Sequence, residues 1–123
     1  MQFSDSLRKN HQFGFVYQNG KSYVNKLLVM YVMENGSDQN RIGISVSKKV
    51  GNSVVRHRVK RLIKESYRLH EKIFNSGLDI VIIARQNAAF ADFKMVENSL
   101  LHLCRLHRII RSDEVISKKS DFE

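Results

Sequence analysis

The amino-acid sequence predicts an α/β fold of the mixed α+β kind, a two-layer sandwich in which helices pack on a small sheet. Apolar segments of strand length alternate with segments of helical periodicity, in the order helix, strands, helix, strand, helix. The 123 residues are 42% hydrophobic, enough for one buried core, and contain no repeat, low-complexity stretch or proline. We therefore expect a single domain over residues 1–123, with a polar tail that frays from about residue 111.

The first third of the chain predicts an arm, a short helix and a strand. Residues 1–9 have no apolar period and are expected to form an irregular arm. Asn10 is the expected cap of a helix that continues to Gln18. The apolar run 27–33 predicts a buried strand, and the polar residues 34–40 predict a turn.

The middle of the chain predicts a strand followed by a long helix. Residues 41–47 alternate strictly, with Ile42, Ile44 and Val46 on one face. The helix is expected from about Ser53 to His70, capped by Asn52 or Ser53 itself.

The last part predicts one more strand and one more helix. Residues 79–85 read as the strand, after a break at Asn75-Ser-Gly77. The helix begins near Asp92, and its apolar side carries Phe93, Val96, Leu100, Leu103 and Cys104.

The charge is strongly positive and unevenly distributed. The formal net charge is +9. Residues 41–70 hold nine Lys and Arg against one acid, Glu65, whereas the other ninety-three residues hold twelve against eleven. A surface that serves solubility alone usually intersperses its signs. The middle segment is therefore the expected binding element for a polyanion.

A helical wheel sorts the long helix into two sides. The expected apolar side carries Val55, Val59, Leu62, Ile63, Ser66 and Leu69. The opposite side is basic and includes Tyr67, with Arg58 on the flank. A solvated helix face would usually interleave acids with bases, because like charges four residues apart repel. Here Arg56, Lys60, Lys64 and Arg68 form one such row, so the pattern favours nucleic acid, with RNA preferred over DNA only weakly.

Other function classes find little support. The acids are scattered, and His102, Cys104 and His107 lack the fourth ligand of a zinc site. Cys104 is expected to be an inert core thiol. No apolar run reaches the length of a membrane span, and no secretory signal is evident, so a cytoplasmic protein is expected.

Residues 41–65, with the sequence RIGISVSKKVGNSVVRHRVKRLIKE, resemble the signature of the ribonuclease P protein family, in which a strand, a glycine loop and an "RNR" helix follow one another. Residues 9–17 with Gly20-Lys21 resemble its N-terminal helix, and residues 79–85 its later strand. The similarity covers roughly residues 7–105. Two positions depart from the pattern: His57 replaces the usual asparagine of the triplet, and Asn87 stands near a common proline. Histidine can still donate a hydrogen bond to a phosphate or a base.

The resemblance implies a fold related to a ribosomal-protein domain, with a left-handed βαβ crossover. It implies an accessory subunit of an endoribonuclease, a hydrolase that removes the 5′ leader of precursor tRNA. The partners would be the catalytic RNA and precursor tRNA, with no DNA and no membrane. The RNA would perform the hydrolysis with Mg²⁺ that it mainly holds itself, so no catalytic or metal-binding residue is expected in the protein. The alternative is a ribosomal-type RNA-binding protein without a processing role.

The resemblance also assigns residues to two sites. A cleft for the leader would involve the aromatic residues of the first helix and first strand, although aromatic residues at helical spacing are more often core. Phe15 and Val16 are assigned to the core. The expected leader-binding residues are Phe13, Tyr17, Tyr31, Ser45 and Ser47. The expected RNA-binding residues are Lys48, Lys49, Asn52, Arg56, His57, Arg58, Lys60, Arg61, Lys64 and Arg68.

Overall fold

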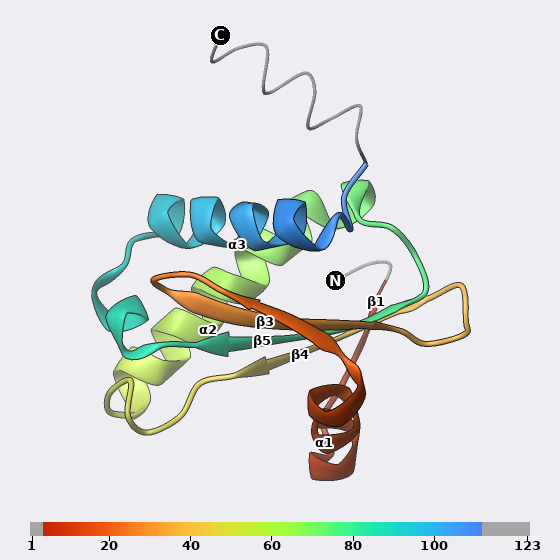
Figure 1. Cartoon of the computed structure of the whole chain (residues 1–123). Helices are drawn as coiled ribbons and strands as arrows, with labels where there is room; N and C mark the ends of the chain where they lie inside the picture. The colour runs from red at the N-terminus through yellow and green to blue at the C-terminus, as the bar shows by residue number, and fades with distance from the viewer. Residues whose placement is uncertain (1–3, 112–123) are drawn as a thin grey trace, which may run out of the picture.

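The computed structural model describes residues 4–111, which form a five-stranded sheet with three α-helices (Figure 1). The part of the expected polar tail that follows Arg111 lies outside the described residues. The strands are β1 (Ser4–Ser6), β2 (Lys21–Val24), β3 (Leu28–Glu34), β4 (Asn40–Ser45) and β5 (Leu78–Ala84). The helices are α1 (Asn10–Asn19), α2 (Ser53–His70) and α3 (Phe93–His107), with the short 3₁₀ helices η1 (Glu71–Ile73) and η2 (Gln86–Phe90).

The sheet has the strand order β1-β4-β5-β3-β2. β4 and β5 are parallel neighbours joined through α2, which makes the βαβ unit that the family resemblance implies. β3 pairs antiparallel with both β5 and β2. β1 pairs in parallel with residues 40–42 of β4, so the edge of β4 beyond Ile42 is left uncovered by a strand.

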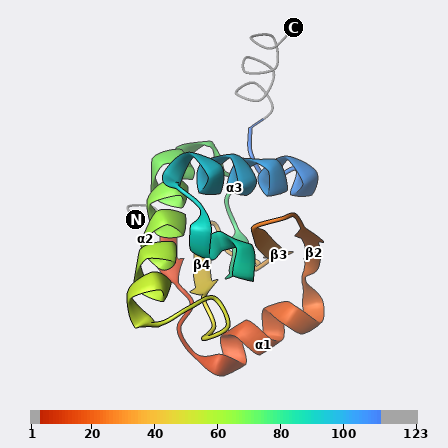
Figure 2. The same cartoon turned by 90° about the vertical axis from the view of Figure 1, so that its left-hand side faces the viewer.

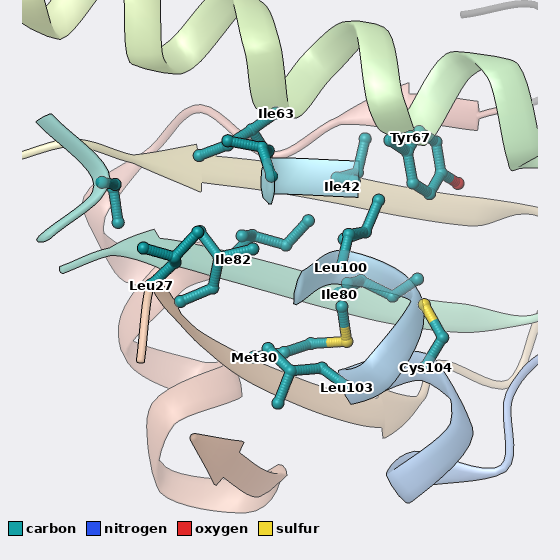
Figure 3. Packing of buried hydrophobic residues seen from close by; sticks show 14 of the residues in the cluster. Leu27, Met30, Ile42, Ile63, Tyr67, Ile80, Ile82, Leu100, Leu103 and Cys104 are labelled. Atoms are coloured by element: carbon teal, nitrogen blue, oxygen red, sulfur yellow. The ribbon is translucent and has the colours of Figure 1, made fainter. Parts of the chain in front are cut away.

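Helices cover both faces of the sheet. α2 and α3 lie on one face, where Ile63 and Leu100 pack with Met30, Ile80 and Ile82 of the central strands (Figure 3). α1 lies on the opposite face, as Figure 1 shows, and buries Val16 in a smaller cluster with Leu7 and Val81. The α+β class with helices packed on a small sheet is thus confirmed, with α1 supplying cover for the second face. None of the helices within residues 4–111 combines the length and the apolar character needed to cross a membrane.

The expected helix α2 is confirmed with its cap. Asn52 has extended backbone angles, and its side-chain oxygen accepts a hydrogen bond from the backbone N–H of Val55 at 3.0 Å. Asp92 caps α3 in the same way through Met95, at 2.8 Å. Both helices therefore begin where a short polar side chain can satisfy an N–H group that has no partner within the helix.

The N-terminal expectations need correction. Part of the expected irregular arm is strand β1, with Ser4 opposite Asn40. Lys9, and not Asn10, is the residue before α1, and the side chain of Gln12 accepts hydrogen bonds from the backbone N–H groups of Lys9 and Arg8. β2 was not expected either. Both missed strands are short and largely exposed edge strands, so their sequences carry little apolar signal.

Three burial assignments were also wrong. Tyr67 was placed on the basic side of the long helix, but it is fully buried, and its hydroxyl lies 2.7 Å from Ser4 Oγ. Leu69 was placed on the apolar side and is 53% exposed. Phe15 was assigned to the core, yet it projects outward from α1, 56% exposed, while its neighbour Val16 is buried as expected.

Candidate RNA-binding surface

The outer side of α2 presents the basic residues that the sequence predicts. Val59 and Ile63 fix the orientation of the helix, because both are fully buried against the sheet. Opposite them lies what we call the basic stripe, in which Arg56 is partly buried and the other members are exposed. Its members are Arg56, His57, Lys60, Arg61, Lys64 and Arg68. Asn52, Lys48 and Lys49 continue the exposed surface at the start of the helix.

The single acid of this segment lies at the far end of the stripe. Glu65 accepts from Arg68 Nη2 at 2.5 Å, and this hydrogen bond is the main reason why the pKa of Glu65 is lowered. Glu65 follows Arg61 by four residues, a spacing at which the two could pair on a helix, but its ion pair is with Arg68. The partial neutralisation therefore falls on the last turn of α2, and the first turns of the stripe keep their full charge.

Arg58 differs from the stripe. Its Nη1 donates to the carbonyl oxygen of Ala91 at 2.9 Å, and its Nη2 donates to the carbonyl oxygen of Ala89. The side chain therefore ties α2 to η2 and the residue that follows it. Both terminal nitrogens of Arg58 are thus engaged within the protein.

A groove of about 800 Å³ runs between α1 and the start of α2, along the uncovered edge of β4. We call it the α1–α2 groove. It unites residues from both predicted sites, since Phe13, Tyr17 and Ser45 share it with residues of the stripe. The groove is lined by Leu7, Arg8, Asn10, Phe13, Gly14, Tyr17, Ile44, Ser45, Val46, Ser53, Arg56, His57 and Lys60.

The lining of this groove is basic and aromatic and contains no acid. Arg56 Nε is buried and, among the described residues, has no hydrogen-bond partner. Buried polar groups are normally satisfied, so this donor at the wall of the groove is available to a ligand that enters it. Arg8 and Asn10 were not predicted as site residues, because only the packing of α1 against the sheet brings its first residue and the chain before it onto the groove.

Three aromatic rings form a chain beneath and along this groove. The centroids of Phe13 and Tyr17 lie 6.3 Å apart, and Tyr17 meets Tyr31 edge-on at 5.0 Å. Tyr31 packs in the smaller core cluster and is not part of the lining. Burial and the neighbouring Tyr31 raise the pKa of Tyr17. Tyr17 thus presents its ring to the groove while Tyr31 supports it from β3.

Gly43 explains how Phe13 reaches its place. A β-carbon at Gly43 would lie 2.7 Å from the Phe13 ring, so only glycine permits this contact. We expect Gly43→Ala to reduce the free energy of unfolding by about 1–3 kcal/mol through overpacking. Gly14→Ala is the matched control, because its β-carbon would meet open space and should stabilise α1 by about 0.5–1 kcal/mol. Urea unfolding of both variants measures this, and a neutral Gly43→Ala would contradict the tight contact.

Ser47 lies apart from the other expected leader residues. It borders a second hollow of about 310 Å³ together with Lys49, Arg85 and Asn87. Arg85 and Asn87 were not predicted as site residues, although they follow β5 directly, and the ends of parallel neighbours such as β4 and β5 meet at one edge. Figure 2 looks onto this end of the molecule and shows the start of α2 and the end of β4 there.

The described residues show no cluster of metal-binding side chains. Within residues 4–111, no group of three or more His, Cys, Asp or Glu side chains could hold a metal ion. His102 lies against Asn25, and His107 against the carbonyl oxygen of Met30. Cys104 is buried in the core, which raises the pKa of its thiol far above the ordinary value. What the surface offers is cations, aromatic rings and a groove.

Comparison with known proteins agrees with this chemistry. A family model described as Ribonuclease P matches residues 1–108. The ribonuclease P protein component of Lachnoclostridium phytofermentans is 60% identical over 111 residues, covering 90% of this chain and 96% of the relative. That of Alkaliphilus metalliredigens is 54% identical over 110 residues, covering 89% and 99%.

Solved structures show the same similarity. The Staphylococcus aureus RNase P protein matches with a TM-score of 0.81 and 36% identity, covering 88% of this chain and 99% of that one. The Thermotoga maritima RNase P protein matches with a TM-score of 0.75 and 33% identity, covering 82% and 96%.

Proposed function

Because this chain belongs to the ribonuclease P protein family and is a subunit of that endoribonuclease, we propose that the basic stripe binds its RNA subunit and the α1–α2 groove holds the 5′ leader of precursor tRNA. The RNA subunit is the partner that family membership implies. The alternative, a ribosomal-type protein with no processing role, is not favoured.

The observation that carries the proposal is the composition of the groove. It places the Phe13 and Tyr17 rings opposite Arg56 and Lys60, with no acid in the lining. Single-stranded nucleic acids are held by aromatic platforms for the bases and by cations for the backbone. An unpaired leader has both features, whereas a duplex would not offer free base faces.

The open edge of β4 gives the groove its floor. Because β1 ends its pairing at Ile42, the continuation of β4 through Ile44 and Ser45 faces the groove. The Ser45 side chain adds a small hydrogen-bonding group there. The second hollow, lined by Ser47, Lys49 and Arg85, would contact the phosphate backbone of a leader that is too long for the groove alone.

We further propose that the Mg²⁺ required for hydrolysis is held mainly by the RNA subunit, since residues 4–111 offer no donor cluster for it. The protein would then contribute binding and no bond-making group. We propose that the protein acts in the cytoplasm. The free, buried thiol of Cys104 is compatible with a reducing compartment.

Reconstitution from the separate subunits tests whether the RNA performs the cleavage and the protein assists it. The protein alone, free of RNA, should leave precursor tRNA intact, because the proposal assigns the hydrolysis to the RNA subunit. Added to the RNA subunit at low magnesium, it should accelerate cleavage. The measurement is single-turnover release of the leader, and cleavage by the RNA-free protein would contradict the proposal.

A second test addresses the leader. Tyr17→Ala should weaken binding of leader-bearing precursor tRNA by about 5- to 150-fold, the contribution of one stacked base, and leave mature tRNA unaffected. Tyr17→Phe keeps the ring and should bind normally. Phe13→Ala should act in the same direction but also lower stability, because the ring packs on Gly43. Equal losses for both tRNA forms would place these rings outside the leader site.

Tyr31 should behave differently in the same assay. It is half-buried behind Tyr17, so Tyr31→Ala is expected to lower the melting temperature and weaken leader binding only through Tyr17. A double variant with Tyr17→Ala should therefore bind the leader no worse than Tyr17→Ala alone.

A further inference from the structure

The most exposed large apolar side chain within residues 4–111 is Phe90, whose surface is 90% accessible. It ends η2, between two residues that are held in place: Ala88 is fully buried and Ala91 nearly so. A phenylalanine exposed to this extent contributes almost nothing to the core. Burying it against a partner would therefore be favourable, and its backbone is already fixed.

Arg58 of α2 fixes the backbone around this ring. Its guanidinium donates to the carbonyl oxygens of Ala89 and Ala91, the residues on either side of Phe90. An arginine can bridge two acceptors in this way because its donors form a rigid fork. The ring is thus presented by a turn that is clamped to the basic helix, and the clamp itself carries positive charge.

The surroundings of the ring are continuous with the basic surface. η2 also borders the second hollow, where Gln86 and Asn87 face Ser47 and Lys49. Figure 2 shows η2, in teal, at the same end of the molecule as the start of α2. Residues 86–91 contain no acid, and the nearest one in sequence, Asp92, is engaged as the cap of α3.

We propose that Phe90 is a stacking platform for an unpaired base of the RNA subunit and that Arg58 is the residue that positions it. The inference rests on the proposed function of α2 as the RNA-binding helix. It adds a contact on the flank of α2 that carries Arg58, whereas the α1–α2 groove receives Arg56 and Lys60. An aromatic ring beside cations is the combination that holds unpaired bases.

Binding of the RNA subunit to Phe90 variants tests this. Phe90→Ala should weaken the affinity about 5- to 150-fold without changing the melting temperature, and Phe90→Tyr should bind as the wild type does. Phe90→Trp provides a direct signal, because the chain contains no other tryptophan, and its emission should be quenched when the RNA binds. Phe15→Ala, which removes an exposed ring from α1, is the matched control and should bind normally.

Arg58→Lys tests the positioning role. Lysine keeps the charge but cannot bridge two carbonyl groups as arginine does. It should weaken RNA binding in the wild-type background and have little effect in the Phe90→Ala background. Equal effects in both backgrounds would mean that Arg58 does not act through Phe90.

Two results would overturn the proposal: unchanged affinity of Phe90→Ala, or an emission of Phe90→Trp that does not respond to saturating RNA. Arg61→Ala separates this failure from failure of the proposed function, because Arg61 belongs to the basic stripe but does not line the α1–α2 groove. If Arg61→Ala weakens binding and Phe90→Ala does not, only the Phe90 contact is wrong. If neither variant weakens binding, the assignment of α2 itself is wrong.

Discussion

Replacing Arg56, Lys60 and Arg61 together with alanine is expected to weaken binding of the RNA subunit by about three orders of magnitude. A hydrogen bond to a charged group contributes about 1.5 kcal/mol or more, and three such contacts would be lost. The slope of log affinity against log salt should also flatten by roughly 2 to 3 in total, because each lost phosphate contact removes about 0.7 to 0.9.

The same variant should fold at least as well as the wild type. Lys60 and Arg61 are exposed, and within residues 4–111 neither makes an ion pair. Arg56, Lys60 and Lys64 repel one another along one row of α2, so truncation removes unfavourable pairs of a few tenths of a kcal/mol each. Weaker RNA binding with unchanged or higher stability is the expected combination.

A charge-matched control separates the stripe from net charge. Lys72, Arg105 and Arg111 are exposed and do not line the α1–α2 groove or the second hollow, so their triple alanine variant carries the same reduction from +9. Its RNA affinity should fall only slightly. An equal loss in both triple variants would show that the net charge matters and the position of the stripe does not.

The elements of this fold could be predicted wherever a single segment carries its own signal. The bounds of α2 follow from a polar cap and a long amphipathic pattern, and the expected strand at 79–85 follows from an apolar run. β1 and β2 carry no such signal. Ser4–Ser6 is a strand only because the edge of β4 is available to pair with it.

The leader residues of the candidate site were assigned by the family resemblance, and residue type alone favoured a core role for their aromatic rings. The resemblance named Phe13, Tyr17 and Ser45, and the structure gathers them with several of the predicted cations in one groove. The resemblance could not separate Ser47 from that groove, because the chain turns away after β4. Nor could it show that Arg58 is tied to η2, since that contact joins residues more than thirty positions apart.

The misplacement of Tyr67 and Leu69 has a related cause. A helical wheel treats all turns of a helix alike, but the C-terminal half of α2 is covered from a second direction. Tyr67 packs edge-on against Phe74, with ring centroids 4.8 Å apart, and its hydroxyl meets Ser4 of β1. Figure 3 shows Tyr67 between α2 and the strands, in the same layer as Ile63.

Tyr67→Ala is accordingly expected to reduce the free energy of unfolding by about 3–5 kcal/mol, the usual cost of removing a buried aromatic ring. Tyr67→Phe should cost only about 0.5–1.5 kcal/mol, because it keeps the ring and loses the hydrogen bond to Ser4. Leu69→Ala should be nearly neutral, since that side chain is 53% exposed. Urea unfolding of the three variants measures this order.

Measuring RNA binding by the same variants tests whether Tyr67 lies on the core side or on the RNA-binding side of α2. Under conditions in which Tyr67→Ala is folded, its affinity for the RNA subunit should match that of the wild type, because a fully buried ring cannot stack on a base. The wheel alone predicts the opposite: a costly Leu69→Ala and a harmless Tyr67→Ala that binds RNA poorly. If that opposite order were measured, the α2 orientation described here would be wrong, and with it the position of the basic stripe, since Tyr67 and the stripe are fixed by the same rotation of one helix.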